Sequence, residues 1–105
     1  MNVRHKNIIN VKSDKPPVVE LDSASHAAYV RFSEAKVKKT HTIDVDHCLV
    51  TMDTDENGEV IGVELLGVIE FGVQALMKKA RIGGLSPELL QHTRYVPANA
   101  EPVAV

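Results

Sequence analysis

The chain has 105 residues, of which 44% are hydrophobic, and a formal net charge of −2. That length allows one domain, and the slightly acidic balance disfavours a nucleic-acid partner, which needs a basic surface. A single cysteine, Cys48, excludes an internal disulfide and favours a reducing compartment, and we find no apolar run long enough for a signal peptide or a membrane span. We therefore expect a cytoplasmic protein that binds neither nucleic acid nor membrane.

The ends of the chain differ in composition from its middle. Residues 1–16 are polar and run into Pro16-Pro17, which indicates a flexible N-terminal arm. A single α+β domain is expected over 17–93, followed by a flexible C-terminal tail over 94–105.

Alternating and β-branched residues predict an antiparallel β-meander of four to five strands between about residues 18 and 66. The first three strands are expected over 18–21, 28–32 and 37–45. A two-residue turn at Asp46-His47 then pairs Val45 with Cys48 and Ile43 with Val50.

Residues 53–64 fill the pattern of an EF-hand calcium loop, through Asp53, Asp55, Asn57, Gly58 and Glu64. An EF-hand also needs a helix on each side, whereas residues 41–52 and 59–66 alternate with period 2, which is typical of strands. We therefore favour a β-hairpin that turns at residues 55–58, without resident calcium. A weak cation site at Asp53, Asp55 and Asn57 is the alternative.

The register of this hairpin also argues against a calcium ion held by both Asp53 and Glu64. A four-residue loop places Met52 opposite Ile61, Val50 opposite Val63 and Cys48 opposite Leu65, so that apolar residues share one face. Glu64 then lies opposite Leu49, about 13 Å along the strand from Asp53.

Two helices are expected after the sheet. A stripe at helical spacing predicts the main helix over 69–81, through Ile69, Val73, Leu76, Met77 and Ala80. Ser86 as N-cap and Pro87 in the first turn predict a short second helix that ends near His92 or Thr93. The expected core, with the main helix packed on one face of the sheet, is Leu21, Val30, Phe32, Ile43, Val45, Cys48, Val50, Met52, Ile61, Val63, Leu65, Val73, Leu76 and Met77.

Potential catalysts and zinc ligands are densest at His41, Asp44, Asp46, His47 and Cys48. Strand alternation separates them onto two faces, and Cys48 falls on the apolar face, so we read Cys48 as a small core residue and His41 as an edge residue. We expect no cofactor, no metal and no enzymatic activity. Lys36, Lys38 and Lys39 are interpreted as charges that protect a strand from aggregation.

Residues 18–66 resemble a family of small bacterial domains of unknown function. The resemblance rests on Asp22 with the run His26-Ala27-Ala28-Tyr29-Val30, and on a D-x-D-x-x-G-x-V-I-G-V-E-L-L motif from Asp53 to Leu66. His26 and Cys48 depart from the residues common in that family. The resemblance implies a small β-meander followed by a helix, with no agreed activity and a possible protein partner.

We expect a non-enzymatic interaction module that forms a homodimer. A domain of this size buries only about 60% of its unfolded surface, which leaves little stability for a monomer. The second sheet face also carries Val18, Tyr29, Leu49 and Val60. The expected interface includes the helix over 69–81 or an edge strand. A small metal-binding protein or enzyme, with calcium at 53–64 or zinc held by His and Cys, is the alternative.

Overall fold

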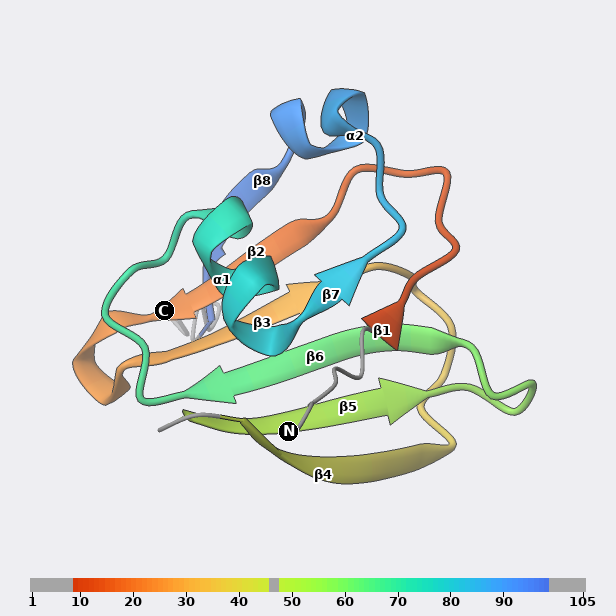
Figure 1. The fold of residues 1–105 in the computed structure, drawn as a ribbon, viewed down its shortest axis with the longest axis horizontal. Coiled ribbons are helices and arrows are strands. Elements are labelled where there is room, and N and C mark those ends of the chain that lie inside the picture. Colours follow the sequence, from red (N-terminus) through yellow and green to blue (C-terminus); the bar gives the residue numbers. More distant parts are fainter. Residues whose placement is uncertain (1–8, 46–47, 99–105) are drawn as a thin grey trace, which may run out of the picture.

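A six-stranded mixed β-sheet forms the body of the protein, with helices over one of its faces (Figure 1). The computed structural model describes residues 9–45 and 48–98. The strands lie in the order β4-β5-β6-β3-β2-β8, and only β2 and β8 run parallel to each other. Their bounds are β2 Val18–Asp22, β3 Ala27–Arg31, β4 Lys39–Val45, β5 Cys48–Thr54, β6 Val60–Leu66 and β8 Arg94–Pro97.

The α+β class is confirmed, but the simple antiparallel meander is wrong. The two hairpin units, β2–β3 and β4–β5–β6, form as expected. However, β3 pairs with β6 rather than with β4, so the chain crosses from β3 to the far edge of the sheet. The apolar strands β3 and β6 therefore occupy the centre, and the polar strand β4 occupies an edge, where its backbone meets water.

The β5–β6 register differs from the expected one by two residues. Met52 pairs with Val63 and Val50 with Leu65, and the ladder shifts at a bulge next to Asp53 and Thr54. The reason lies in the turn: Asp55 Oδ1 accepts hydrogen bonds from the amides of Asn57 and Glu59, both at 2.9 Å. A shift of two preserves which face each side chain occupies, so the apolar face is still correct. The expected β4–β5 pairs, Val45 with Cys48 and Ile43 with Val50, are confirmed.

Helix α1 spans Val73–Ala80, which is shorter than the expected 69–81. Ile69 lies outside it and is 82% exposed. Arg81, in the left-handed conformation, ends the helix by donating its backbone N–H to the carbonyls of Met77 and Lys78. Helix α2 spans Pro87–Gln91, and Ser86 caps it by accepting a hydrogen bond from the Leu89 amide, as expected.

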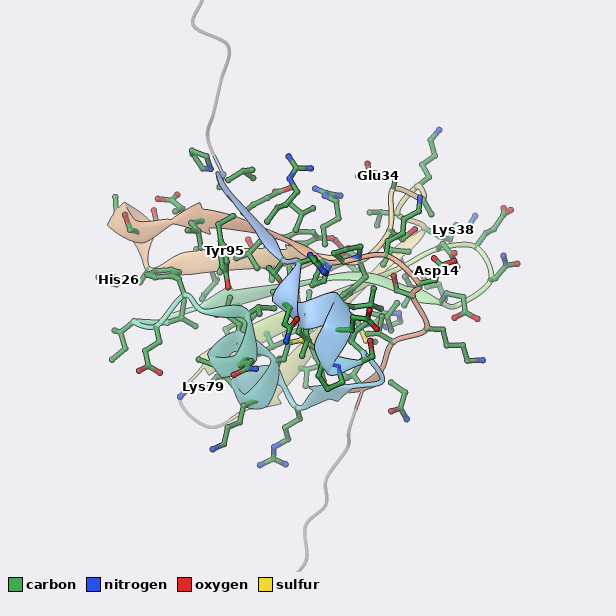
Figure 2. The ribbon with its side chains drawn as sticks, turned by 90° about the horizontal axis from the view of Figure 1, so that it is seen from above. Asp14, His26, Glu34, Lys38, Lys79 and Tyr95 are labelled. Atoms are coloured by element: carbon green, nitrogen blue, oxygen red, sulfur yellow. The ribbon has the colours of Figure 1, made fainter. Side chains whose placement is uncertain are left out.

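Segments near both ends of the chain join the fold. In Figure 1, β1 (Ile9–Asn10) pairs in parallel with β7 (Ile82–Gly83) beside α1. Residues 94–97, which the sequence pattern assigns to the C-terminal tail, form β8. Tyr95 extends from β8 toward α1 (Figure 2), where its hydroxyl accepts a hydrogen bond of 2.9 Å from the Val73 amide.

The core lies between α1 and one face of the sheet. Nine of the expected core residues are buried: Val30, Phe32, Val50, Ile61, Val63, Leu65, Val73, Leu76 and Met77. Leu21, Ile43 and Met52 are partly buried around them, and the side chains of Val45 and Cys48 lie outside the described part of the structure. Ala80, from the predicted helical stripe, is also buried. Buried residues outside the expected core list and stripe come from loops and strands: Val11, Val19, Ala28, Val68 and Ile82.

The two faces of the sheet predict different responses to loss of a leucine side chain. Leu65 on the core face is 0% exposed and Leu49 on the opposite face is 41% exposed. Leu65→Ala should lower the free energy of unfolding by about 2–5 kcal/mol, measured by urea denaturation. Leu49→Ala should cost no more than about 0.5 kcal/mol, and equal losses would contradict this placement of the core.

Candidate interaction surface

The sheet face that points away from α1 is called the open face here. It carries the alternate residues of each strand, and many of them are polar. Among them are Val18, Glu20, Asp22, Ala27, Tyr29, Arg31, Thr40, Thr42, Leu49, Thr51, Asp53, Gly62, Glu64 and Leu66. Aligned cross-strand pairs form rows on it, because directly opposed residues share a face. One row runs from Arg31 through Gly62 and Asp53 to Thr40.

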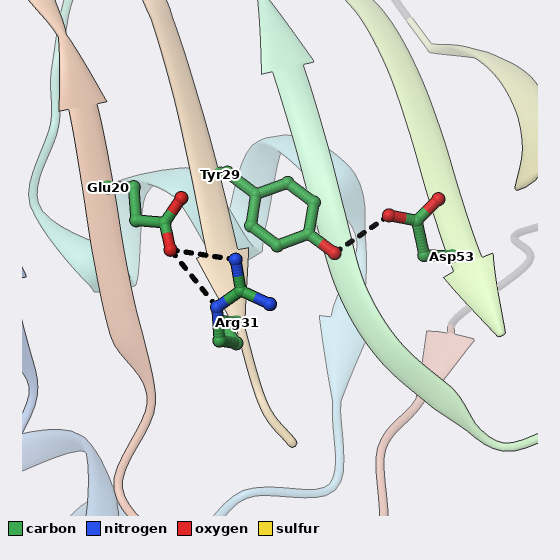
Figure 3. Close-up of polar contacts among 4 residues, drawn as sticks. All are labelled: Glu20, Tyr29, Arg31 and Asp53. Carbon is green, nitrogen blue, oxygen red and sulfur yellow. Dashed lines mark hydrogen bonds and ion pairs between the residues drawn. The ribbon is translucent and has the colours of Figure 1, made fainter. Parts of the chain in front are cut away.

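A chain of hydrogen bonds crosses four strands on this face. The Tyr29 hydroxyl on β3 donates to Asp53 Oδ2 on β5 at 2.8 Å (Figure 3). Thr40 Oγ1 on β4 donates to the other oxygen, Asp53 Oδ1, at 2.7 Å. Asp53 therefore ties the edge strand β4 to the centre of the sheet, and both of its carboxylate oxygens are engaged.

Gly62 lets the Tyr29 ring lie across β6 to reach Asp53. A Cβ atom at position 62 would meet the Tyr29 hydroxyl and the ring atoms Cζ and Cε2, the last at 2.6 Å. Any residue other than glycine would displace the ring, so this is a close approach that requires the missing side chain. The ring in turn covers the backbone at Gly62, which has no side chain of its own. This cover offsets the weak strand propensity of glycine.

An ion pair holds the other side of the ring. Arg31 donates from Nε at 3.0 Å and from Nη2 at 2.8 Å to the same Glu20 oxygen (Figure 3). Its guanidinium carbon lies 5.0 Å from the Tyr29 ring centroid, within cation–π range. Since exposed ion pairs add little stability by themselves, the contribution of this pair is to fix where the ring lies.

The environment of Tyr29 favours its protonated form. Burial of the ring, the hydrogen bond to Asp53 and the negative charge of that carboxylate raise the pKa of the Tyr29 hydroxyl above its ordinary value of about 10. The hydroxyl therefore remains a hydrogen-bond donor at neutral pH, as the link to Asp53 requires.

The candidate calcium ligands, Asp53, Asp55, Asn57 and Glu64, lie on a β-hairpin. Strands, rather than helices, flank the loop, which excludes the EF-hand fold at this site. The expected pairing of Glu64 with Leu49 is wrong: Glu64 lies opposite Thr51, diagonal to Asp53 and closer than about 13 Å. Glu64 accepts a 3.4 Å hydrogen bond from Thr51, and the Asp55 carboxylate and the Asn57 amide serve the turn.

Among the residues that the structure describes, no three His, Cys, Asp or Glu side chains gather in a way that could hold a metal ion. The absence of resident calcium stays a prediction, with a weak cation site at Asp53, Asp55 and Asn57 as its alternative.

Of the expected zinc and catalytic group, the structure describes the side chain of His41 alone. It is exposed on the edge strand, with Nε2 3.4 Å from the hydroxyl of Thr54. Asp46 and His47, and the side chains of Asp44 and Cys48, lie outside the described residues.

Tyr29, Gly62 and Arg31 were not recognisable as a unit from the sequence pattern, which places Tyr29 among apolar residues of the second face. One signal was available: Gly62 interrupts a strand pattern, and an isolated strand glycine often marks a close approach by another group. Its partner could not be identified, because that requires knowing that β3 lies beside β6.

The family model described as "Protein of unknown function (DUF2283)" matches residues 19–68. This segment is therefore similar to that family of unknown function. The family resemblance stated above is thereby confirmed, over β2 to β6 and the turn that follows. No curated protein and no solved structure matches the chain.

The matched DUF2283 segment contains every residue of the Glu20–Arg31, Tyr29–Asp53 and Thr40–Asp53 contacts. Within residues 9–45 and 48–98, no helix is long and apolar enough to cross a membrane.

The close approach of the Tyr29 ring to Gly62 predicts that the effect of Gly62→Ala on stability depends on whether that ring is present. Gly62→Ala in the wild-type chain should cost about 1–3 kcal/mol of unfolding free energy, because the ring must move. In a Tyr29→Ala background, the same Gly62→Ala change should be neutral or stabilising, because alanine is the better strand residue. Chemical denaturation of the four proteins measures the difference, and equal cost in both backgrounds would place the cause in the backbone instead.

The pKa of Tyr29 predicts a loss of stability at alkaline pH. Folded Tyr29 holds its proton to higher pH than the unfolded chain, so its contribution is complete below about pH 10 and is lost progressively above it. The free energy of unfolding should therefore fall more steeply above about pH 10 in the wild type than in Tyr29→Phe. The other titratable groups are the same in both proteins. Parallel pH profiles of the unfolding free energy would therefore contradict a raised pKa of Tyr29.

Proposed function

We propose that the protein is a non-enzymatic interaction module that forms a homodimer through the outer edge of β4. One observation carries this proposal: β4, Lys39–Val45, is a seven-residue strand at the end of the sheet, and no described strand pairs with its outer side. Such an edge presents unpaired backbone N–H and C=O groups, which are suited to the addition of another strand.

The backbone alternation identifies which residues of β4 point outward. The Gly67 amide donates to the His26 carbonyl next to β3, so the even-numbered residues of β6 face β5. Following the cross-strand pairs, the odd-numbered residues of β4 face β5. The N–H and C=O groups of Thr40, Thr42 and Asp44 therefore point away from the sheet.

The opposite edge of the sheet is less suited to strand addition. Strand β8 has four residues, and its Arg94 and Ala98 amides donate toward β2. By alternation, the outward positions are Tyr95 and Pro97, and proline has no N–H to donate. A proline at an outward edge position is a common protection against pairing.

The apolar stripe of α1 offers less support for an interface than the sequence suggests. Val73, Leu76, Met77 and Ala80 are all buried within the protein's own fold. A partner would have to use the remaining surface of the helix, where Lys78 and Lys79 are exposed. Of the two surfaces that the sequence suggests, the edge strand is therefore the better supported.

The non-enzymatic part of the proposal is supported by the arrangement of the polar groups. On the open face, the Tyr29, Arg31 and Asp53 side chains bond to each other or to neighbours, and so they brace the sheet. A hollow of about 220 Å³ beside α1 includes two ionisable residues, Glu70 and Lys79, in its otherwise uncharged lining. A second hollow, of about 500 Å³, lies beside the turn at residues 55–58, where the Asp55 carboxylate is already bonded to turn amides. Catalysis normally needs several polar groups that converge in a cleft. The single cysteine supports a cytoplasmic location as part of this proposal.

The proposal predicts a mass about twice the 11.5 kDa of one chain at high micromolar concentration. Thr42→Pro removes an outward N–H from an edge strand, where proline is tolerated, and should give a monomer. Thr42→Val keeps the backbone donor and should remain a dimer. Light scattering, with circular dichroism to verify folding, measures both.

A monomeric wild-type protein at this concentration would overturn the proposal. A folded Thr42→Pro variant that remains a dimer would move the interface away from β4.

A further inference from the structure

We infer that the partner at the β4 edge is a second copy of this chain in antiparallel register, with Thr42 opposite Thr42 of the second copy. This inference rests on the proposed function and specifies the geometry of its interface. It follows from three features of β4: which residues share a face, which backbone groups point outward, and where the charges lie.

The sharing of faces limits the possible registers. Residues directly opposed across an antiparallel pair lie on the same side of the sheet. A twofold axis perpendicular to the sheet keeps both α1 layers on one side, so open-face residues must oppose open-face residues. Thr42 can then lie opposite Thr40, Thr42 or Asp44 of the second copy, whereas an odd shift would place the partly buried Ile43 against the open face.

The outward backbone groups select among these three registers. With Thr42 opposite itself, Thr40 lies opposite Asp44 of the second copy, and Asp44 lies opposite Thr40. Each of the three outward residues then forms a hydrogen-bonded pair with an outward residue of the second copy. Each pair exchanges two bonds, which gives about six bonds between the copies. A shift of two in either direction would place one outward residue beyond the end of the partner strand.

The charges on β4 fit the same arrangement. Lys38 and Lys39 stand at its start, and Asp44 stands near its end. Antiparallel pairing places Asp44 of each copy opposite Thr40 of the other and diagonal to its Lys38, twice by symmetry, whereas Lys39 alternates onto the other face of the strand. Parallel pairing would instead place lysine beside lysine, which is unfavourable. The strand is therefore complementary to itself in one direction only.

The core-facing side of the edge gains cover in this register. Ile43 is partly buried at the margin of the hydrophobic core. It lies opposite His41 of the second copy, and His41 is exposed in the single chain. Pairing therefore shields the margin of the core in both copies.

Charge substitutions at position 42 test the register. Thr42 is exposed on the open face, so Thr42→Asp and Thr42→Lys should leave the folded single chain intact. In the inferred register each substitution sets two like charges directly opposite one another. Each should weaken the homodimer by about two- to fivefold in Kd. An equimolar mixture of the two variants should form a heterodimer tighter than either homodimer, as measured by sedimentation velocity.

A cysteine at the same position provides a second measurement. Directly opposed residues of a hydrogen-bonded pair lie about 5.5 Å apart at Cα, within the range that a disulfide spans. Thr42→Cys should form a disulfide-linked dimer under mild oxidation. Thr51→Cys, on the open face but inside the sheet, and the wild type with its Cys48 should not.

Substitutions on the helices control for net charge. Lys79→Glu on α1 and Glu88→Lys on α2 change the charge at exposed positions away from β4, and both should leave Kd unchanged. A wild-type dimer that tolerates both position-42 charges, shows no heterodimer preference and gives no Thr42→Cys cross-link would overturn this register and leave the proposed homodimer standing. A wild-type monomer would overturn both.

Discussion

The contact of the Tyr29 ring across Gly62 with Asp53 is the constraint on which the rest of the sheet depends. Strands β3 and β5 are not neighbours, yet this contact joins them over β6 and continues through Thr40 to the edge strand. The apolar layer under α1 holds the same strands from the other side. The central strands are thereby fixed on both faces, and the Thr40–Asp53 hydrogen bond ties the start of β4 to them.

The sequence carries strong information about local structure and little about the order of the strands. Asn57-Gly58, Ser86-Pro87 and the stripe from Val73 to Ala80 identify their turn and helices because the signals lie within a few residues of each other. The chain crosses from β3 to β4 because the more apolar strands take the central positions of the sheet. That order depends on a comparison of all the strands and not on neighbouring residues. A register error of two residues arose because the side chain of Asp55 closes the turn one way rather than another.

The candidate surface was less predictable than the fold. Acidic residues in a calcium-like spacing drew attention to Asp53, but its partners Tyr29 and Thr40 lie on strands distant in the sequence. The two edges of the sheet also differ in a way that only the strand order reveals. Pro97 lies on one edge and an uncharged run, Thr40 to Ile43, lies on the other. The twofold pairing proposed for one edge would close the assembly and leave no free β4 edge for growth into a fibre.

The hydrogen bond between the Val73 amide and the Tyr95 hydroxyl bears on how the newly made chain acquires its structure. Helix α1 has eight residues, and its N-cap residue, Gly72, has no side chain to cap it. It is shorter than a helix that persists alone in water. On the ribosome its residues emerge before Tyr95 and before the strand that carries it. The helix and its side of the core can therefore be completed only after β8 has emerged and docked beside β2.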